Sequence, residues 1–155
     1  MKRVLSILSL GAFALLAANA NGQQAQIGVF NRQAIVVAYY RSPQWADQLK
    51  QHQAQLDQAK KDKDKTKVKE LSSWGQDAQD RAHQQLIGKA PIDDILAVIK
   101  PGIDQIEKSA NLERLVPAPA ADATEAKVDV TGQLLDWLKA DDVTRRLIST
   151  LPPQK

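Results

Sequence analysis

The chain has 155 residues, of which 43% are hydrophobic and 25% charged, a balance that fits one compact domain with an extension. Aromatic residues make up only 5% and there are seven glycines, which favours helix-rich structure over an all-β sandwich. The formal net charge is +3, but two of the basic residues lie in the first three positions, so the remainder is close to neutral. Nucleic-acid binding is therefore not expected, because it needs a clustered basic face.

The N-terminal segment has the pattern of a secretory signal. Lys2 and Arg3 precede an uncharged apolar run over residues 4–18, and residues 18–20 form a small-x-small cleavage site. We therefore expect cleavage after Ala20 and export from the cytoplasm. A retained membrane anchor is the alternative, but a run of about 15 residues is shorter than the roughly 20 that span a bilayer. The chain has no cysteine, which excludes a disulfide and a lipid-modified cysteine.

The next segments predict a strand followed by a helix. Residues 26–31 place Ile27 and Val29 on one face and Phe30 on the other, as in a short strand. Residues 32–40 are rich in β-branched and aromatic side chains, which makes helix and strand hard to separate. We interpret them as a short helix.

Residues 43–90 carry a long helical pattern. Ser42 is placed as an N-cap before Pro43 at the first helical position, where the missing N–H costs nothing. Two stripes with alternating spacings of three and four follow, separated by a lysine-rich segment. This pattern predicts an antiparallel helical hairpin with its tip near Thr66. The first stripe is Trp45, Leu49, His52, Leu56 and Ala59, and the second is Val68, Leu71, Gly75, Ala78, Ala82 and Gln85.

The predicted register pairs Leu49 with Leu86 and places Trp74 beside residues 59–60. Fully burying a leucine contributes roughly 1.5–3 kcal/mol, whereas several seam positions hold Ala, Gln, His or Gly. We therefore expect a marginal, bendable arm that is partly open to apolar partners. Trp45 lies in heptad phase, which favours the seam, while Trp74 is undecided between seam and surface. The candidate partner-binding residues are Trp45, Leu49, Leu56 and Trp74.

Residues 60–69, KKDKDKTKVK, form a strongly basic segment at the predicted tip. Charge runs of this kind usually do no more than solvate a turn. The alternative is that the segment steers the protein towards anionic lipid surfaces or acidic partners. The lysines concerned are Lys60, Lys61, Lys63, Lys65, Lys67 and Lys69.

No catalytic or metal-binding pattern is found in the same region. His52 and His83 would face each other in the predicted register, but stable metal sites need three or four ligands and only Asp80 is near. Residues 72–73, Ser-Ser, lack a nucleophile elbow, and there is no phosphate-binding glycine loop. We therefore expect no enzymatic activity, no cofactor and no metal.

The segment after Pro91 predicts a strongly amphipathic helix. Isoleucine and leucine residues recur at helical spacing over residues 92–106. Asp93 and Asp94 lie in its first turn, where capping and the helix dipole explain them better than acid–base catalysis. Pro101 should bend this helix or divide it into two shorter ones.

The C-terminal third predicts two strands and two helices. Residues 112–116 and 127–130 are interpreted as strands, with an Ala/Pro-rich loop between them. Thr131 is predicted to cap the following helix, which carries Trp137 in the core. A last short helix is expected to start at residues 141–142.

Over residues 26–139 the order of these elements resembles the Skp/OmpH family of periplasmic chaperones. The resemblance rests on the strand IGVFN, the charged hairpin, the block ILAVIKPGIDQIEKSANLERLVPA and the ending VDVTGQLLDWLK. It implies a mostly α, α+β fold with a small body of short strands and a protruding antiparallel helical hairpin. The expected division is signal 1–20, first strand and helix 21–42, arm 43–90, remaining body 91–140 and extension 141–155.

The resemblance also implies a function, namely that of an ATP-independent holdase. In that family three subunits form a homotrimer whose arms enclose unfolded outer-membrane proteins in the periplasm. The hairpin of this chain looks shorter than a family arm, and residues 140–155 extend beyond the usual end. An alternative is a non-catalytic envelope adaptor or structural coiled-coil protein that binds one specific folded partner.

Overall fold

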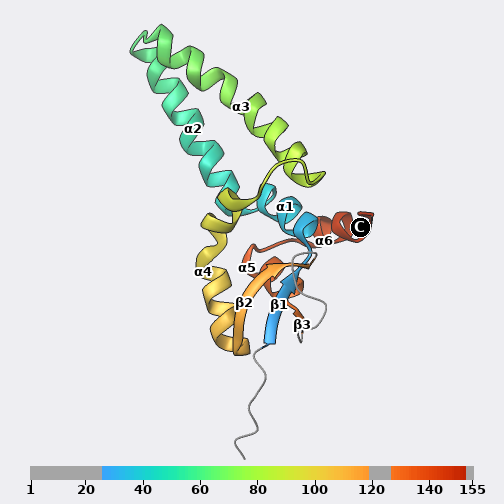
Figure 1. Ribbon diagram of the computed structural model, residues 1–155. Coiled ribbons are helices and arrows are strands. Elements are labelled where there is room, and N and C mark those ends of the chain that lie inside the picture. The colour runs from blue at the N-terminus through green and yellow to red at the C-terminus, as the bar shows by residue number, and fades with distance from the viewer. Residues whose placement is uncertain (1–25, 119–126, 153–155) are drawn as a thin grey trace, which may run out of the picture.

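The computed structural model describes residues 26–118 and 127–152. The predicted signal and most of the Ala/Pro-rich loop lie outside these residues. The described chain is mostly helical, with a small three-stranded parallel sheet (Figure 1). No helix in the described ranges is both long and apolar enough to cross a membrane. The elements are β1 Gln26–Phe30, α1 Arg32–Tyr40, α2 Pro43–Lys61, α3 Lys65–Leu86, α4 Asp93–Ala110, β2 Leu112–Pro117, β3 Lys127–Asp129, α5 Thr131–Trp137 and α6 Asp142–Ser149.

The sheet has β1 at its centre, with β2 and β3 parallel to it on either side. The strands match the predicted segments closely. Gly28 in β1 leaves room for the leucine side chains of β2. A Cβ at this position would lie 2.9 Å from side-chain atoms of both Leu112 and Leu115. Because parallel neighbours need a crossover, the path from β1 to β2 contains α1 to α4.

The core forms where α1 packs with the sheet, α4 and α5. The predicted helix 32–40 is confirmed: Asn31 caps it by accepting a hydrogen bond from the backbone N–H of Ala34 at 3.0 Å. Its β-branched residues are tolerated because they are buried rather than exposed to water. The core residues of α1, α4, α5 and the C-cap of α5 are Ile35, Val36, Ala38, Tyr39, Ile95, Ile99, Ile106, Leu134, Leu135 and Leu138.

Helix α4 runs through Pro101 as a single element, so the predicted alternative of two shorter helices is wrong. Gly102, the next residue, allows close packing between α4 and α5. A Cβ on Gly102 would lie 2.5 Å from Cδ2 of Trp137 in α5, so only glycine allows the indole to approach the helix. Burial of isoleucines on the same helix offsets the lost backbone hydrogen bond at Pro101.

The last two helices begin differently, because α6 has a side-chain N-cap and α5 has none. Asp141 caps α6 as predicted, accepting a hydrogen bond from the backbone N–H of Thr144 at 2.7 Å. The predicted cap at Thr131 is wrong, because Thr131 is already the first residue of α5. Its hydroxyl instead accepts a hydrogen bond from the backbone N–H of Asn31 at 2.9 Å, which joins α5 to the start of α1.

Helices α2 and α3 contact each other and extend together away from the sheet (Figure 1). The Ser42 hydroxyl caps α2 as predicted, at 3.3 Å from the backbone nitrogen of Trp45. The two helices are joined by residues 62–64 rather than near Thr66. The difference arises because Asp64 caps α3 by accepting from the N–H of Lys67 at 3.0 Å, which makes Thr66 helical.

The packing at Gly102 generates a test of the fold. Gly102→Ala should lower the free energy of unfolding by about 1–3 kcal/mol, because its methyl group overlaps the indole of Trp137. The matched control is Gly75→Ala in α3, where a Cβ meets nothing within 4 Å. Removing a helical glycine there should raise stability by about 0.5–1 kcal/mol. Urea unfolding measures both changes, and a stability gain in both variants would contradict the close packing.

Candidate functional site

A cluster of aromatic rings lies where α1 leads into the helix pair α2 and α3. Tyr39 and Tyr40, at the end of α1, pack edge to face with ring centroids 5.1 Å apart. Trp45, in the first turn of α2, lies 4.8 Å from Tyr40 in a similar arrangement. Trp74 of α3 then stacks on Trp45 at 5.5 Å. These contacts place an aromatic anchor at the base of the helix pair.

The predicted register of the helix pair is wrong. Trp74 stacks between Trp45 and His52, with 3.9 Å separating the His52 and Trp74 centroids, rather than beside residues 59–60. His52 Nε2 also lies 3.3 Å from the carbonyl oxygen of Leu71. The cause is the connection at residues 62–64, which ends earlier than predicted and shifts every facing pair.

This register also removes the predicted pairing of the two histidines. Trp74 and Leu71 face His52, while His83 is exposed in the last turn of α3. In the described residues there is no group of three or more His, Asp, Glu or Cys side chains that could hold a metal. Ser72 and Ser73 donate their hydroxyl hydrogen bonds to carbonyls of their own helix.

Three of the four predicted partner-binding residues come together. Trp45 and Trp74 are both half-buried, so each serves the seam and still reaches the surface. Leu49 is 44% exposed and lines a shallow hollow beside the two tryptophans. Leu56 is half-buried two turns further along α2 and is absent from that hollow.

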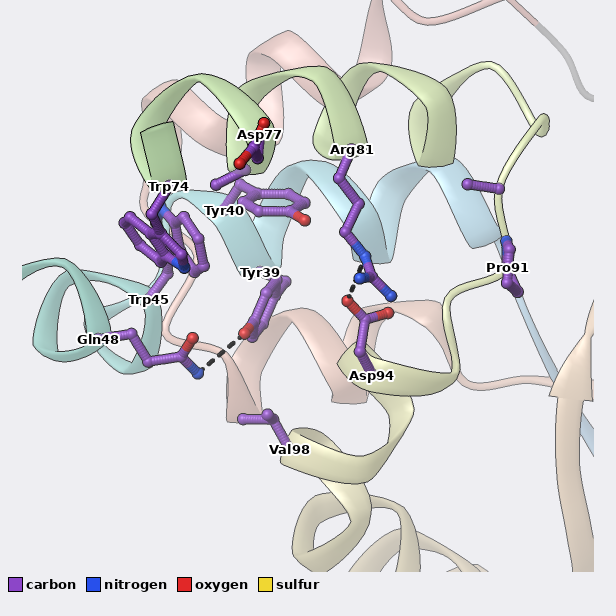
Figure 2. A pocket seen from close by; sticks show the side chains of 12 residues that line it. Tyr39, Tyr40, Trp45, Gln48, Trp74, Asp77, Arg81, Pro91, Asp94 and Val98 are labelled. Atoms are coloured by element: carbon purple, nitrogen blue, oxygen red, sulfur yellow. Dashed lines mark hydrogen bonds and ion pairs between the residues drawn. The ribbon is translucent and has the colours of Figure 1, made fainter. Parts of the chain in front are cut away.

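A second hollow, with a volume of about 640 Å³, is also lined by the two tryptophans (Figure 2). This size is typical of sites for small ligands or side chains. Its walls come from α1, α2, α3, the connection before α4 and α4 itself. The lining residues are Tyr39, Tyr40, Trp45, Gln48, Trp74, Asp77, Ala78, Arg81, Ala90, Pro91, Asp94 and Val98.

Gln85 forms hydrogen bonds to Tyr40 and Asp94, two residues that line this hollow. The sequence did not predict these bonds. The Gln85 side chain is completely buried and accepts a hydrogen bond from the Tyr40 hydroxyl at 2.8 Å. Its amide nitrogen donates to the carbonyl of Pro91 at 2.9 Å and to Asp94 at 2.7 Å. One glutamine thus joins α1, α3 and α4. The heptad pattern marked position 85 as inward, but it gave no sign of these partners.

Charged groups complete the same junction. Arg81 Nε pairs with Asp94 Oδ2 at 3.0 Å along one wall of the hollow (Figure 2). Arg32 of α1 donates to the backbone carbonyls of Gln85 and Ala90, which satisfies acceptors at the end of α3. The end of α3 is therefore held by side chains from two other helices.

The two tyrosines resist ionisation in this setting. Burial, with the Asp94 carboxylate as the second cause, raises the pKa of Tyr40 to about 12. Burial also raises the pKa of Tyr39, partly opposed by the hydrogen bond that its hydroxyl oxygen accepts from Gln48 at 3.0 Å. Both phenols are therefore neutral at physiological pH and act as aromatic walls with fixed hydroxyls.

The predicted basic segment lies at the far end of the helix pair. Its lysines are exposed, and the nearest ion pair is a 4.0 Å contact between Lys60 and Asp57. A shallow hollow of about 420 Å³ lies among four of them and Val68. Lys63 adopts a left-handed backbone, with φ of 57°, in the connection. The four lysines are Lys60, Lys63, Lys65 and Lys69.

Comparisons with protein-family models, curated proteins and solved structures found no match for this chain.

Replacing Gln85 tests the junction at the base of the helix pair. Gln85→Leu should lower the free energy of unfolding by at least about 2 kcal/mol, because it deprives Tyr40, Pro91 and Asp94 of a buried partner. Gln84→Leu, at the exposed neighbouring position, should stay within about 0.5 kcal/mol of the parent. Chemical denaturation measures both values. Equal effects in the two variants would show that the network does not stabilise the junction.

Proposed function

We propose that the chain is an ATP-independent holdase of the Skp/OmpH type, which binds unfolded outer-membrane proteins in the periplasm. In this proposal α2 and α3 form the antiparallel hairpin arm and the sheet with its covering helices forms the body. The contact surface is the seam of the arm, with Trp45, Leu49, Leu56 and Trp74 as its apolar residues.

The observation that carries the proposal is how little α2 and α3 bury. These helices have 19 and 22 residues, yet Ala59 is the only buried residue of the first and Gln85 the only one of the second. Fully burying one leucine contributes roughly 1.5–3 kcal/mol, and the arm realises only part of this at Leu49 and Leu56. Apolar surface therefore stays available to a partner without any opening of the body.

Weak contacts of this kind become effective when several act together. We extend the proposal to a homotrimer, in which three arms offer low-affinity apolar contacts to one unfolded chain. Linked contacts raise avidity without a deep pocket on any single arm. Release then needs no nucleotide, because a client that folds into the membrane withdraws its exposed apolar segments.

The holdase proposal is tested by diluting urea-unfolded outer-membrane barrels with and without the full chain. Light scattering should fall when the chain is in molar excess, and ATP should have no effect. Leu49→Gln with Leu56→Gln should weaken the suppression severalfold. The matched control is Val143→Gln with Leu147→Gln in α6, since these side chains are 52% and 43% exposed outside the arm.

Three outcomes would contradict this function. If an excess of the chain does not suppress aggregation, the holdase proposal is wrong and an adaptor with one folded partner is favoured. If the arm and α6 variants lose equal amounts of aggregation suppression, the arm is not the contact surface. A monomeric native mass would remove the enclosing trimer.

The lysine-rich tip is proposed to steer the arms towards anionic lipid surfaces. Replacing the six lysines by glutamine should reduce co-sedimentation with phosphatidylglycerol vesicles at low salt, because each basic residue near such a surface contributes about 1 kcal/mol. Binding of the parent should also fall as salt is raised. Unchanged binding in the variant would leave the tip as a solvated turn. The positions changed are Lys60, Lys61, Lys63, Lys65, Lys67 and Lys69.

A further inference from the structure

The 640 Å³ hollow at the base of the helix pair has properties that the open seam lacks. Figure 2 shows Tyr39, Tyr40, Val98 and the Arg81–Asp94 pair around it. We propose that this hollow is a specific subsite for an aromatic side chain from a basic segment of an unfolded polypeptide. The inference rests on the holdase proposal and deepens it, because it names what the base of the arm selects.

The polar atoms of the wall explain why the occupant should be apolar. The Tyr40 hydroxyl donates to Gln85, and the Tyr39 hydroxyl accepts from Gln48. Asp94 accepts from Gln85 through one oxygen and pairs with Arg81 through the other. Because each of these groups already has a partner within the wall, an occupant need not bring hydrogen-bonding groups of its own.

Arg81 favours an aromatic occupant over an aliphatic one. Its Nε is fixed by Asp94 at 3.0 Å, so the planar guanidinium is held at the wall of the hollow. A guanidinium stacks favourably on an aromatic face, and the gain is larger when its orientation is already set. The tyrosine rings on the opposite side add edge-to-face contacts.

The charge of the lining favours a basic segment. Asp77 and Asp94 are opposed only by Arg81, so the wall carries an excess of one negative charge. Asp77 is exposed and has no ion-pair partner within the described ranges. A lysine next to the bound ring would meet this carboxylate, whereas a glutamate would be repelled.

The neighbouring hollow makes an extended polypeptide a better occupant than an isolated small molecule. This second hollow, of about 280 Å³, shares Tyr40, Trp45, Trp74 and Ala78 with the first. The aromatic stack therefore separates two adjoining depressions. A chain lying across the stack presents side chains to both, and backbone continuity links the two contacts.

The experiment measures fluorescence anisotropy of labelled, soluble Gly/Ser peptides added to the full chain. One peptide has a central Phe flanked by lysines, the second replaces Phe by Leu, and the third replaces the lysines by glutamates. The Phe–Lys peptide should bind tightest, with the Glu peptide weaker by about two- to fivefold or more. Equal affinity for all three peptides would overturn the subsite.

Two variants locate the binding. Val98→Phe fills the hollow and should weaken the Phe–Lys peptide by about tenfold, with thermal unfolding recorded to verify the fold. Asp77→Lys changes only an exposed side chain and should reverse the preference between lysine- and glutamate-flanked peptides. Asp80→Lys, on the same helix but outside the lining, is the matched control and should keep the parent preference.

The outcomes separate this inference from the holdase proposal. Aggregation suppression with no effect of Asp77→Lys or Val98→Phe on peptide binding would overturn the subsite and leave the holdase intact. Selective binding of the Phe–Lys peptide without aggregation suppression would support the subsite and remove the holdase. An effect of Asp80→Lys equal to that of Asp77→Lys would also overturn the subsite, because general charge would then explain the preference.

Discussion

The buried side chain of Gln85 is the constraint on which the relation between body and helix pair depends. It binds the Tyr40 hydroxyl of α1, the carbonyl of Pro91 and the carboxylate of Asp94 at the start of α4. A buried amide is stable only when its partners are present, so the three helices must meet in this one arrangement. Arg32, which binds carbonyls at the end of α3, reinforces the same geometry.

From this junction outward, the side chains that pack between the two helices become smaller. At the base, the stacked rings of Trp45 and Trp74 adjoin the buried tyrosine of α1. Beyond His52 the seam holds half-buried aliphatic side chains and the small buried Ala59, and at the connection it gives way to exposed lysines. Local stability follows buried apolar contact, so the far end of the pair should open more readily than its base. The molecule thus combines a fixed attachment with an adaptable surface.

Much of the fold could be predicted because local signals agreed with tertiary packing. The N-caps at Ser42 and Asp141, the short strands and the helices appear where the sequence placed them, although Gly75 of the second predicted stripe is exposed. The register of the helix pair could not be predicted, since it depends on which polar residue of 62–66 caps α3. Asp64 and Thr66 are both plausible caps by residue type. Placing the tip near Thr66 shifted Trp74 away from its true neighbours in the predicted register.

The candidate site was only half visible in the sequence, for a physical reason. Periodicity identifies residues that share a helix face, and it correctly selected Trp45 and position 85. It says nothing about groups that meet from different helices, such as Arg81 with Asp94 or Tyr40 with Gln85. The open seam follows from the composition of one helix pair, whereas the hollow forms where α1, α4 and the connection before α4 meet that pair. The selectivity that we propose for the base of the helix pair would therefore be a property of the junction. Under this proposal, a chain with the same seam but a different junction would bind apolar segments without discriminating among them.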